Sequence, residues 1–567
     1  MSDAVMSLAA DFDRVGRDQW MELVEQVLRG APFDKKLVGT TYDGIQIQPL
    51  YTGDDHPGDS SVPGAAPFTR GSRVAGGAWQ VRQAHSRATG NQAVLDDLGG
   101  GADAIELHID GETSREELEE LLDGVPATVP IMLAPGSETA IWHLVDLWDY
   151  RGVARDQALG GFGIDPRDPA VAEAAANTLN RNYPNVLVAV VNGARLADRG
   201  ATEAQELAGS LADGVAYLRA CDQAGIDLAS AVDKLEFRYA AGVDQFLTMA
   251  KLRAARRLWA RVTEACGIDP AAQRQHAVTA GAMMTRRDPW VNMIRTTVAC
   301  FAAAAGGADA ITVSPYDSAI GVPDPLGLRI ARNTQLLLRE ESHLYQVIDP
   351  SGGSYYIESL TDALTGAAWG LFQELEAGAS LSERIDAAHE ARSRDVAIRR
   401  LPLTGVSEFP DLDEPAVDRP PVACDPELRR LAEPFEALRD AAEASPSRPT
   451  AFLASLGSIV VHTARTAFSA NLLAAGGIST SGGDGFDTPA QAASAWKSSG
   501  SPIAVVCSSD EMYEEHAAAA VTALREAGCG YVLLAGRPDD RWGADGYIFM
   551  GCDALATLRA VHERLGL

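Results

Sequence analysis

Several features that would place this chain in common functional classes are scarce or missing. Its 48 basic residues are outnumbered by 78 acidic ones, and the formal charge is −30. So large a negative charge repels nucleic acid and anionic membrane surfaces. No apolar run reaches the roughly 18 residues that a membrane-spanning helix requires. The composition therefore argues against a nucleic-acid-binding protein and against a membrane protein.

Cysteine is also sparse and irregularly placed. The seven cysteines stand at positions 221, 266, 300, 424, 507, 529 and 552. Their wide spacing matches neither a zinc site nor a disulfide framework. The N-terminus has no cationic stretch followed by an apolar one, which a secretory leader would need. We therefore expect a reducing, cytoplasmic location.

The length and the apolar pattern predict the fold. A chain of 567 residues with 46% hydrophobic side chains is too long for one core. Eight short apolar runs alternate with helical stretches, which is typical of a (β/α)8 TIM barrel, and we assign this barrel to residues 79–384. The runs cover residues 79–83, 104–109, 130–134, 160–164, 186–191, 235–240, 276–281 and 310–314.

Three further segments flank this barrel. Residues 1–78 form an N-terminal arm with an extended segment, and its helical pattern has one apolar face. Residues 385–447 are helical and rich in proline, as in a linker. Residues 448–567 alternate short strands and helices, which predicts a small doubly wound, flavodoxin-like α/β domain. The apolar face of the arm consists of Trp20, Leu23, Val24 and Val27.

The carboxyl ends of the barrel strands show no clear pair of nucleophile and base. His108 and Asp110 face the same side of a strand, so they are candidates for an acid–base pair or half a metal site. The competing interpretation is a hydrogen-bonded histidine at the end of a strand. His276 is either a ligand or a satisfied packing group.

Two helical segments carry basic residues that we place on the surface. In residues 243–262, the set Lys251, Arg253, Arg256 and Arg257 lies off the predicted sheet-facing stripe, which indicates a solvated face. In residues 328–358, one amphipathic helix is expected with Arg332 on its surface, followed by a tight loop at residues 349–353. The predicted apolar face of that helix consists of Ile330, Thr334, Leu337 and Leu338.

The amino-acid sequence of these segments resembles that of a known family. The chain is similar to the cobalamin-dependent acyl-CoA mutases, the methylmalonyl-CoA mutase family. The segments that carry this similarity are LADGVAYLRA at residues 211–220, MAKLRAARRLWA at 249–260, ARNTQL at 331–336 and VIDPSGGSYYIE at 347–358. The resemblance extends over nearly the whole chain. It implies a TIM barrel followed by a cobalamin-binding domain, and the interconversion of succinyl-CoA and (R)-methylmalonyl-CoA with adenosylcobalamin.

The resemblance also identifies positions where catalytic members carry polar side chains. The tyrosine that follows the first strand in those members is Ala84 here, and the proton-donating histidine after the fifth strand is Arg195. His276 is retained, but the glutamine two places later is Val278. These replacements remove the polar lining that faces the substrate. The arginine would fill or close the barrel axis.

The motif that holds cobalt in this family, D-x-H-x-x-G, is degenerate here. Neither of two alignments of residues 456–465 restores the aspartate and the glycine. Without a gap the motif positions hold Ile459, Val461 and Ala464, and with one inserted residue they hold Val460, His462 and Arg465. His462 would lack an orienting carboxylate, so we expect a degenerate cobalamin-binding domain.

The resemblance therefore implies the non-catalytic small (β) subunit of a heterodimer, with a large (α) catalytic subunit as its partner. Adenosylcobalamin would be bound by that partner, and the arm would wrap around it. We predict no catalytic, cofactor-binding or metal-binding residue on this chain. One alternative is an independently active acyl-CoA mutase variant with altered specificity, in which Arg195 or His276 has a new catalytic role. The other is a cobalamin-binding protein that uses His462.

Overall fold

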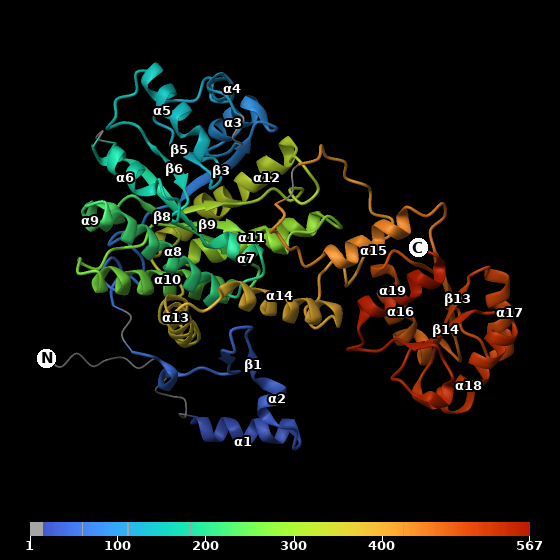
Figure 1. Ribbon diagram of the computed structural model, residues 1–567. Helices are drawn as coiled ribbons and strands as arrows, with labels where there is room; N and C mark the ends of the chain where they lie inside the picture. Colours follow the sequence, from blue (N-terminus) through green and yellow to red (C-terminus); the bar gives the residue numbers. More distant parts are fainter. Residues whose placement is uncertain (1–14, 59–60, 110–112, 181–182, 423–424) are drawn as a thin grey trace.

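The molecule has two α/β bodies and a projecting arm (Figure 1). The computed structural model describes residues 15–58, 61–109, 113–180, 183–422 and 425–567. Among these residues, no helix combines the length and the apolar character needed to cross a bilayer.

The first body is a closed barrel of eight parallel strands in the order β10-β3-β4-β5-β6-β7-β8-β9. Each strand coincides with one of the apolar runs in the sequence, so the predicted barrel is confirmed. The strands are β3 (Gln80–Ser86), β4 (Ala104–His108), β5 (Ile131–Leu133), β6 (Gly160–Ile164), β7 (Val186–Asn192), β8 (Leu235–Ala241), β9 (Gln275–Thr279) and β10 (Ala310–Thr312).

Helices surround this barrel and cover the outward-facing side chains of its strands. Val81, Ile105 and Leu107 are fully buried between strands and helices. Burying such apolar surface is the main stabilising term of the layer. The barrel helices are α3 (Gly90–Gly99), α4 (Arg115–Leu121), α5 (Ile141–Tyr150), α6 (Val171–Asn180), α7 (Gly193–Asp198), α8 (Glu203–Gln223), α9 (Leu228–Val232), α10 (Gln245–Ala265), α11 (Trp290–Ala305) and α12 (Pro325–Leu336).

The second body is a five-stranded parallel sheet in the order β12-β11-β13-β14-β15. Helices α16 and α19 pack on one face, and α17 and α18 pack on the other. This arrangement confirms the predicted doubly wound domain. The elements are β11 (Thr450–Ser455), α16 (Ile459–Ala475), β12 (Ser479–Gly482), α17 (Pro489–Ser499), β13 (Ile503–Cys507), α18 (Asp510–Glu526), β14 (Tyr531–Leu534), β15 (Gly546–Tyr547) and α19 (Ala554–Leu565).

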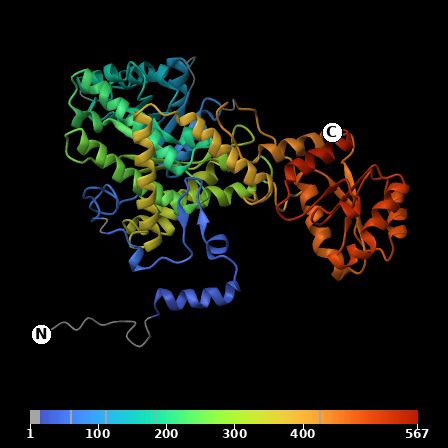
Figure 2. The ribbon, with the colours of Figure 1, turned by 60° about the horizontal axis from the view of Figure 1, so that its bottom comes forward.

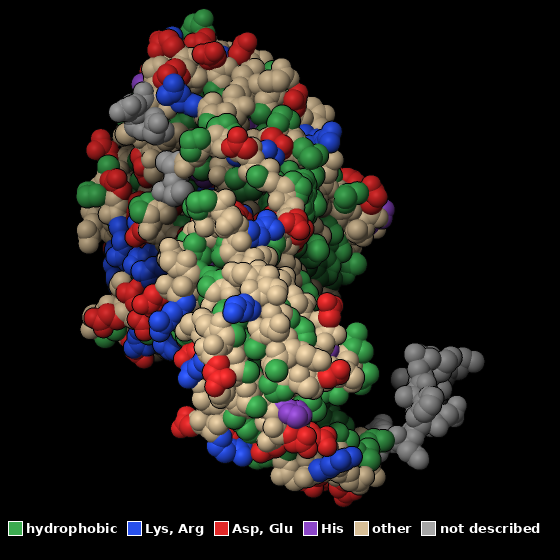
Figure 3. Space-filling model, turned by 90° about the vertical axis from the view of Figure 1, so that its right-hand side faces the viewer, with side chains coloured by type: hydrophobic (Ala, Val, Ile, Leu, Met, Phe, Trp, Pro, Cys, Tyr) green, Lys and Arg blue, Asp and Glu red, His purple; other side chains and the backbone are tan. Residues whose placement is uncertain are grey.

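This second domain lies beside the barrel rather than around it. Figure 3 looks at the molecule from its right-hand side and shows acidic and basic side chains scattered over this face among uncharged surface. Strand β12 was missed in the sequence because its segment, STSG, has small polar residues and a glycine instead of an apolar run.

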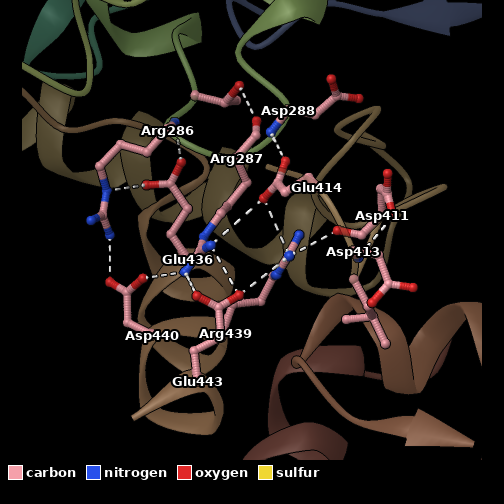
Figure 4. Close-up of polar contacts among 12 residues, drawn as sticks. Arg286, Arg287, Asp288, Asp411, Asp413, Glu414, Glu436, Arg439, Asp440 and Glu443 are labelled. Atoms are coloured by element: carbon pink, nitrogen blue, oxygen red, sulfur yellow. Dashed lines mark hydrogen bonds and ion pairs between the residues drawn. The ribbon is translucent and has the colours of Figure 1, made fainter. Parts of the chain in front are cut away.

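The connection between the two bodies is ordered by ion pairs (Figure 4). Helices α13 (Tyr355–Glu376), α14 (Leu381–Ala397) and α15 (Glu433–Glu443) follow the barrel. Arg286, in the loop after β9, binds Asp440 of α15 at 2.6 Å, and Arg287 binds Glu443 at 2.7 Å. The predicted division at residue 384 falls inside α14, which packs on both α8 and α19.

The arm contains α1 (Arg17–Leu28), α2 (Phe33–Leu37) and a small hairpin of β1 (Gly39–Thr40) and β2 (Gln46–Ile47). Figure 2 shows α1 set apart from the barrel. The residues after α2 are docked: Tyr42 donates to Asp395 at 2.9 Å, and Asp43 accepts the backbone N–H of Ala204 at 3.2 Å. Helix α1 itself has no buried residue.

The helix predicted in residues 328–358 ends earlier than we expected, and some of the side chains that it buries differ from the predicted ones. Helix α12 ends at Leu336, and a π-helical turn, Leu337–Glu341, follows. Arg332 is 8% exposed and binds Asp97 at 2.8 Å, whereas Leu337 is half exposed. The expected apolar face was right at Thr334, which is buried, and at Leu338, which packs against the barrel core, and it was wrong at Leu337. The surface position expected for Arg332 was also wrong, because its carboxylate partner lies far away in the sequence.

The interpretation of α10 as carrying a solvated basic face was also wrong for three of its four residues, whereas Arg257 is partly exposed and pairs with Asp362 at 3.2 Å. Lys251, Arg253 and Arg256 are buried, each below 4% exposure. Arg253 pairs with Asp349 of the tight loop, and Arg256 donates to backbone carbonyls, including that of Thr69 at 3.1 Å. These partners lie far away in the sequence, so helical periodicity alone does not reveal them.

Candidate functional site

The interior of the barrel is filled with charged side chains. Arg82 on β3 and Glu236 on β8 face one another across the axis and form a two-pronged ion pair, with Nη1–Oε2 at 2.8 Å and Nη2–Oε1 at 3.0 Å. Each side chain is 3% exposed. A bidentate pair satisfies the fork of the guanidinium and both carboxylate oxygens together.

His276 on β9 completes this part of the axis. Its Nδ1 lies 3.1 Å from Nη1 of Arg82, and its Nε2 lies 2.8 Å from Oγ1 of Thr312. Because a guanidinium can only donate, Nδ1 accepts and Nε2 carries the proton. Burial first, and the charge of Arg82 second, lower the pKa of His276 to about 3. It is a neutral, satisfied packing group, which is one of the two interpretations that the sequence left open.

Glu106 on β4 extends this charged network, because its Oε2 lies 4.0 Å from Nη1 of Arg82 and 3.6 Å from Nδ1 of His276. Glu106 also accepts from Nη1 of Arg238 at 2.7 Å and lies 2.8 Å from Nε2 of His108. Burial would raise the pKa of Glu106, but the charge of Arg238 and the hydrogen bond from His108 hold it well below its usual value. Asp110, the other member of the predicted acid–base pair, lies outside the described residues. The contact between His108 and Glu106 agrees with the alternative interpretation, a hydrogen-bonded histidine at the end of a strand.

Small apolar side chains occupy the positions that the resemblance aligns with the substrate-facing polar groups. Val278 on β9 is 8% exposed and packs with Ala194 and Ala240. Ala84 on β3 is half-buried. Neither side chain can hydrogen-bond to a substrate carbonyl, and neither can transfer a proton.

Arg195 does not fill the barrel axis, and that expectation was wrong. It lies on α7, its side chain is 55% exposed, and it pairs with Glu427 of the linker. The linker crosses the mouth of the barrel at this point, where Arg429 donates its backbone N–H to the carbonyl of Asp198 at 2.9 Å. This segment supplies a carboxylate outside the axis, so the guanidinium is drawn outward.

The polar residues of the axis were mostly missed in the sequence, although a signal was present. Glu106 and His108 are two apart on one strand, and Glu236 and Arg238 are two apart on another. Side chains two apart face the same side of a strand. Charged residues at alternate positions of a buried barrel strand therefore point into the axis.

His462, the histidine of the degenerate cobalt motif, is buried at the edge of the second domain. His462 lies in the first turns of α16 and is 2% exposed, with Nδ1 at 3.2 Å from Oγ1 of Thr466. A Cβ atom on Gly485 would lie 3.0 Å from its Nε2, so the glycine loop packs directly on the imidazole. Burial lowers the pKa of His462. These residues do not fit a corrin held through this histidine.

No group of three or more histidine, cysteine, aspartate or glutamate side chains is placed to hold a metal ion in the described ranges.

The architecture defines a two-domain protein, a TIM barrel followed by a flavodoxin-like domain. The family model described as methylmalonyl-CoA mutase matches residues 166–459. The chain belongs to the methylmalonyl-CoA mutase family, whose members are in general cobalamin-dependent isomerases.

Individual relatives agree with this assignment. The chain is 44% identical to the methylmalonyl-CoA mutase small subunit of Streptomyces virginiae, over all of this chain and 99% of that protein. It is 35% identical to the small subunit of Propionibacterium freudenreichii subsp. shermanii, over all of this chain and 97% of that protein. The similarity to the methylmalonyl-CoA mutase of Rhizobium meliloti is 31% and covers 70% of this chain and 64% of that protein.

Proposed function

We propose that this chain is the non-catalytic small (β) subunit of a heterodimeric adenosylcobalamin-dependent methylmalonyl-CoA mutase. In this proposal the large (α) subunit binds the cofactor and interconverts succinyl-CoA and (R)-methylmalonyl-CoA. The observation that carries the proposal is the barrel axis, which is occupied by the paired side chains of Arg82, Glu236 and His276.

An enclosed radical rearrangement needs space along this axis and polar groups aimed at the substrate carbonyl. Here the axial charges are satisfied by one another. Admitting a thioester would separate the buried pair of Arg82 and Glu236, and breaking such a pair costs about 3–5 kcal/mol. The apolar side chains of Ala84 and Val278 at the mouth offer nothing in compensation.

The cofactor assignment rests on the second domain. His462, the histidine of the degenerate motif, is enclosed by α16 and the glycine loop, and none of the carboxylates that the structure describes contacts it. A spectral titration of the isolated chain with adenosylcobalamin should therefore show no saturable binding. Saturable binding would support the alternative, a cobalamin-binding protein.

The partner assignment rests on the arm. Helix α1 has an apolar face without a buried residue, and Leu23 and Val27 are 59% and 81% exposed. Exposed apolar faces of this kind mark interaction sites. We assign this face to the large subunit.

One observation favours the other alternative, an independently active acyl-CoA mutase variant. His108 is about half exposed at the carboxyl end of a barrel strand, and Glu106 holds its Nε2. A histidine oriented by a carboxylate is the usual arrangement of a general base. This dyad is a stronger candidate than the residues named from the sequence, because Arg195 is paired with Glu427 and His276 is buried among its hydrogen-bond partners.

The deciding experiment measures turnover of succinyl-CoA with adenosylcobalamin. It compares this chain alone, a large subunit alone, and the two after co-expression. We expect activity in the co-expressed pair and none in this chain alone. Activity of the lone chain that is lost in His108→Gln would reject the subunit proposal and support the variant enzyme.

A further inference from the structure

A cleft on the outside of the barrel is unrelated to the axis and to the arm. It lies between α5 and α6 and has a volume of about 390 Å³. Figure 1 shows these helices on the side of the barrel away from the second domain. Small-molecule sites typically enclose roughly 300–1,000 Å³, so the size suits a ligand rather than a few waters.

The walls of this cleft are apolar and aromatic. Phe162 and Ile164 project outward from β6 and form buried wall, Ile141 and Trp142 come from α5, and Tyr183 precedes β7. An apolar lining of this kind excludes water from a bound hydrocarbon or ring. The cleft would therefore accept the apolar body of a ligand.

The ionised groups among the described lining residues are carboxylates, those of Glu138, Asp168 and Glu173. One cation that the structure describes, the guanidinium of Arg155, lies over the ring of Tyr183 at 5.8 Å from its centroid. None of the three carboxylates forms an ion pair within the part of the chain that the structure describes. Glu138 and Asp168 accept backbone N–H groups, from Gly136 at 3.1 Å and from Ala170 at 2.7 Å, and these bonds hold the carboxylates in place.

We propose that this cleft binds an organic ammonium ion, a compact cation attached to an apolar or aromatic body. The body would lie against the aromatic wall and the ammonium group against the carboxylates. Aromatic faces also attract a cation. This site is separate from the proposed subunit function and does not depend on it.

The first test uses three probes with the same phenethyl body on the full chain. Isothermal titration with phenethylammonium, phenethyl alcohol and hydrocinnamate compares a cation, a neutral molecule and an anion. We expect saturable binding of the cation, weaker binding of the alcohol and no binding of the anion. Equal binding of the cation and the anion, or no saturable binding of the cation, would overturn the proposal.

Variants then locate the site. The double substitution Glu138→Gln and Glu173→Gln should weaken phenethylammonium binding by about tenfold or more, because each lost charge pair is worth about a kilocalorie. The matched control is Asp146→Asn, an exposed carboxylate on α5 outside the cleft. It should leave the affinity within about twofold. An equal loss in both variants would show that the probe only senses the acidic surface.

A cleft-filling variant, Ala174→Trp, separates the apolar part of the site from the charges. Ala174 lines the cleft on α6 and is half-buried. The substitution should remove binding of both the cation and the alcohol, with a thermal unfolding curve as the check on folding. Retained binding in a folded Ala174→Trp protein would place the probe elsewhere and reject this cleft.

Discussion

The barrel axis and the arm both depart from the usual rule that charges face water and apolar side chains face the core. In the axis, Arg82 and Glu236 are charged and 3% exposed. On the arm, Leu23 and Val27 are apolar and 59% and 81% exposed. The axis meets its requirement within the chain, because each charge has a partner. The arm does not, because within residues 15–58 and the other described ranges only Phe33 is seen to pack on this face, against Trp20, and Leu23 and Val27 stay exposed.

This difference separates a region whose unfavourable groups are paired within the chain from a region whose apolar face would be covered by a second molecule. The buried charges of the barrel interior are paired with one another, so a bound ligand is not needed to neutralise them. An uncovered amphipathic helix gains free energy when a second surface buries it. In the proposed heterodimer, the barrel is thus the self-sufficient region, and the arm is the dependent one.

The largest effect should come from breaking the axial ion pair. Arg82→Met leaves the carboxylate of Glu236 buried without its partner, and we expect a loss of about 3–5 kcal/mol in the free energy of unfolding. The double substitution Arg82→Met and Glu236→Leu removes both charges and should cost less than the single one. Urea unfolding of the isolated chain, read as the barrel transition, measures both.

The control for this prediction is the exposed pair of Arg195 and Glu427. Arg195→Met should cost at most about 1 kcal/mol, because water screens a surface ion pair. If Arg82→Met were no more costly than Arg195→Met, the axis would not be the tightly paired interior described here.

A smaller effect concerns pH. The pKa of His276 is lowered from 6.5 to about 3 in the folded chain. Between these values the unfolded chain binds a proton that the folded chain does not, so stability falls as the pH decreases through this window. One proton corresponds to a slope of about 1.4 kcal/mol per pH unit. Above pH 6.5 this histidine contributes no pH dependence.

The upper part of the window isolates this histidine from the axial carboxylates. The pKa values of Glu106 and Glu236 are lowered from 4.5, so the stability that they contribute is present above that value and is lost only at lower pH. Unfolding measured from about pH 6.5 down to about pH 4.5 should lose this slope in His276→Gln. An unchanged slope would mean that His276 is charged in the folded chain.

The fold was largely predictable, because both sheets are parallel and buried and their strands read as short apolar runs. Each of the eight barrel strands was located in this way. Strand β12 was not, since a segment of serine, threonine and glycine has no apolar run to detect.

The site was less predictable, since its charges are satisfied by long-range contacts. Arg253 and Asp349 are 96 residues apart, and Arg82 and Glu236 are 154 apart. A local pattern places an arginine on a helix or a strand but does not show its partner. Arg195 illustrates the same limit, because its partner Glu427 belongs to the linker and not to the barrel.

The smallest effect on this chain should come from the arm, and the same change should matter most to its partner. Replacing Leu23 and Val27 by glutamate puts charges where both side chains already face solvent. The free energy of unfolding of the isolated chain should therefore change by no more than about 0.5 kcal/mol. The substitutions should weaken association with the large subunit, measured by co-elution after co-expression, because they would bury two charges at the contact.

Glu22→Gln and Glu25→Gln, on the exposed acidic side of the same helix, provide the matched control. Equal co-elution of the two pairs of variants would remove the arm as the contact, and the dependent region would then have to be sought elsewhere on the molecule.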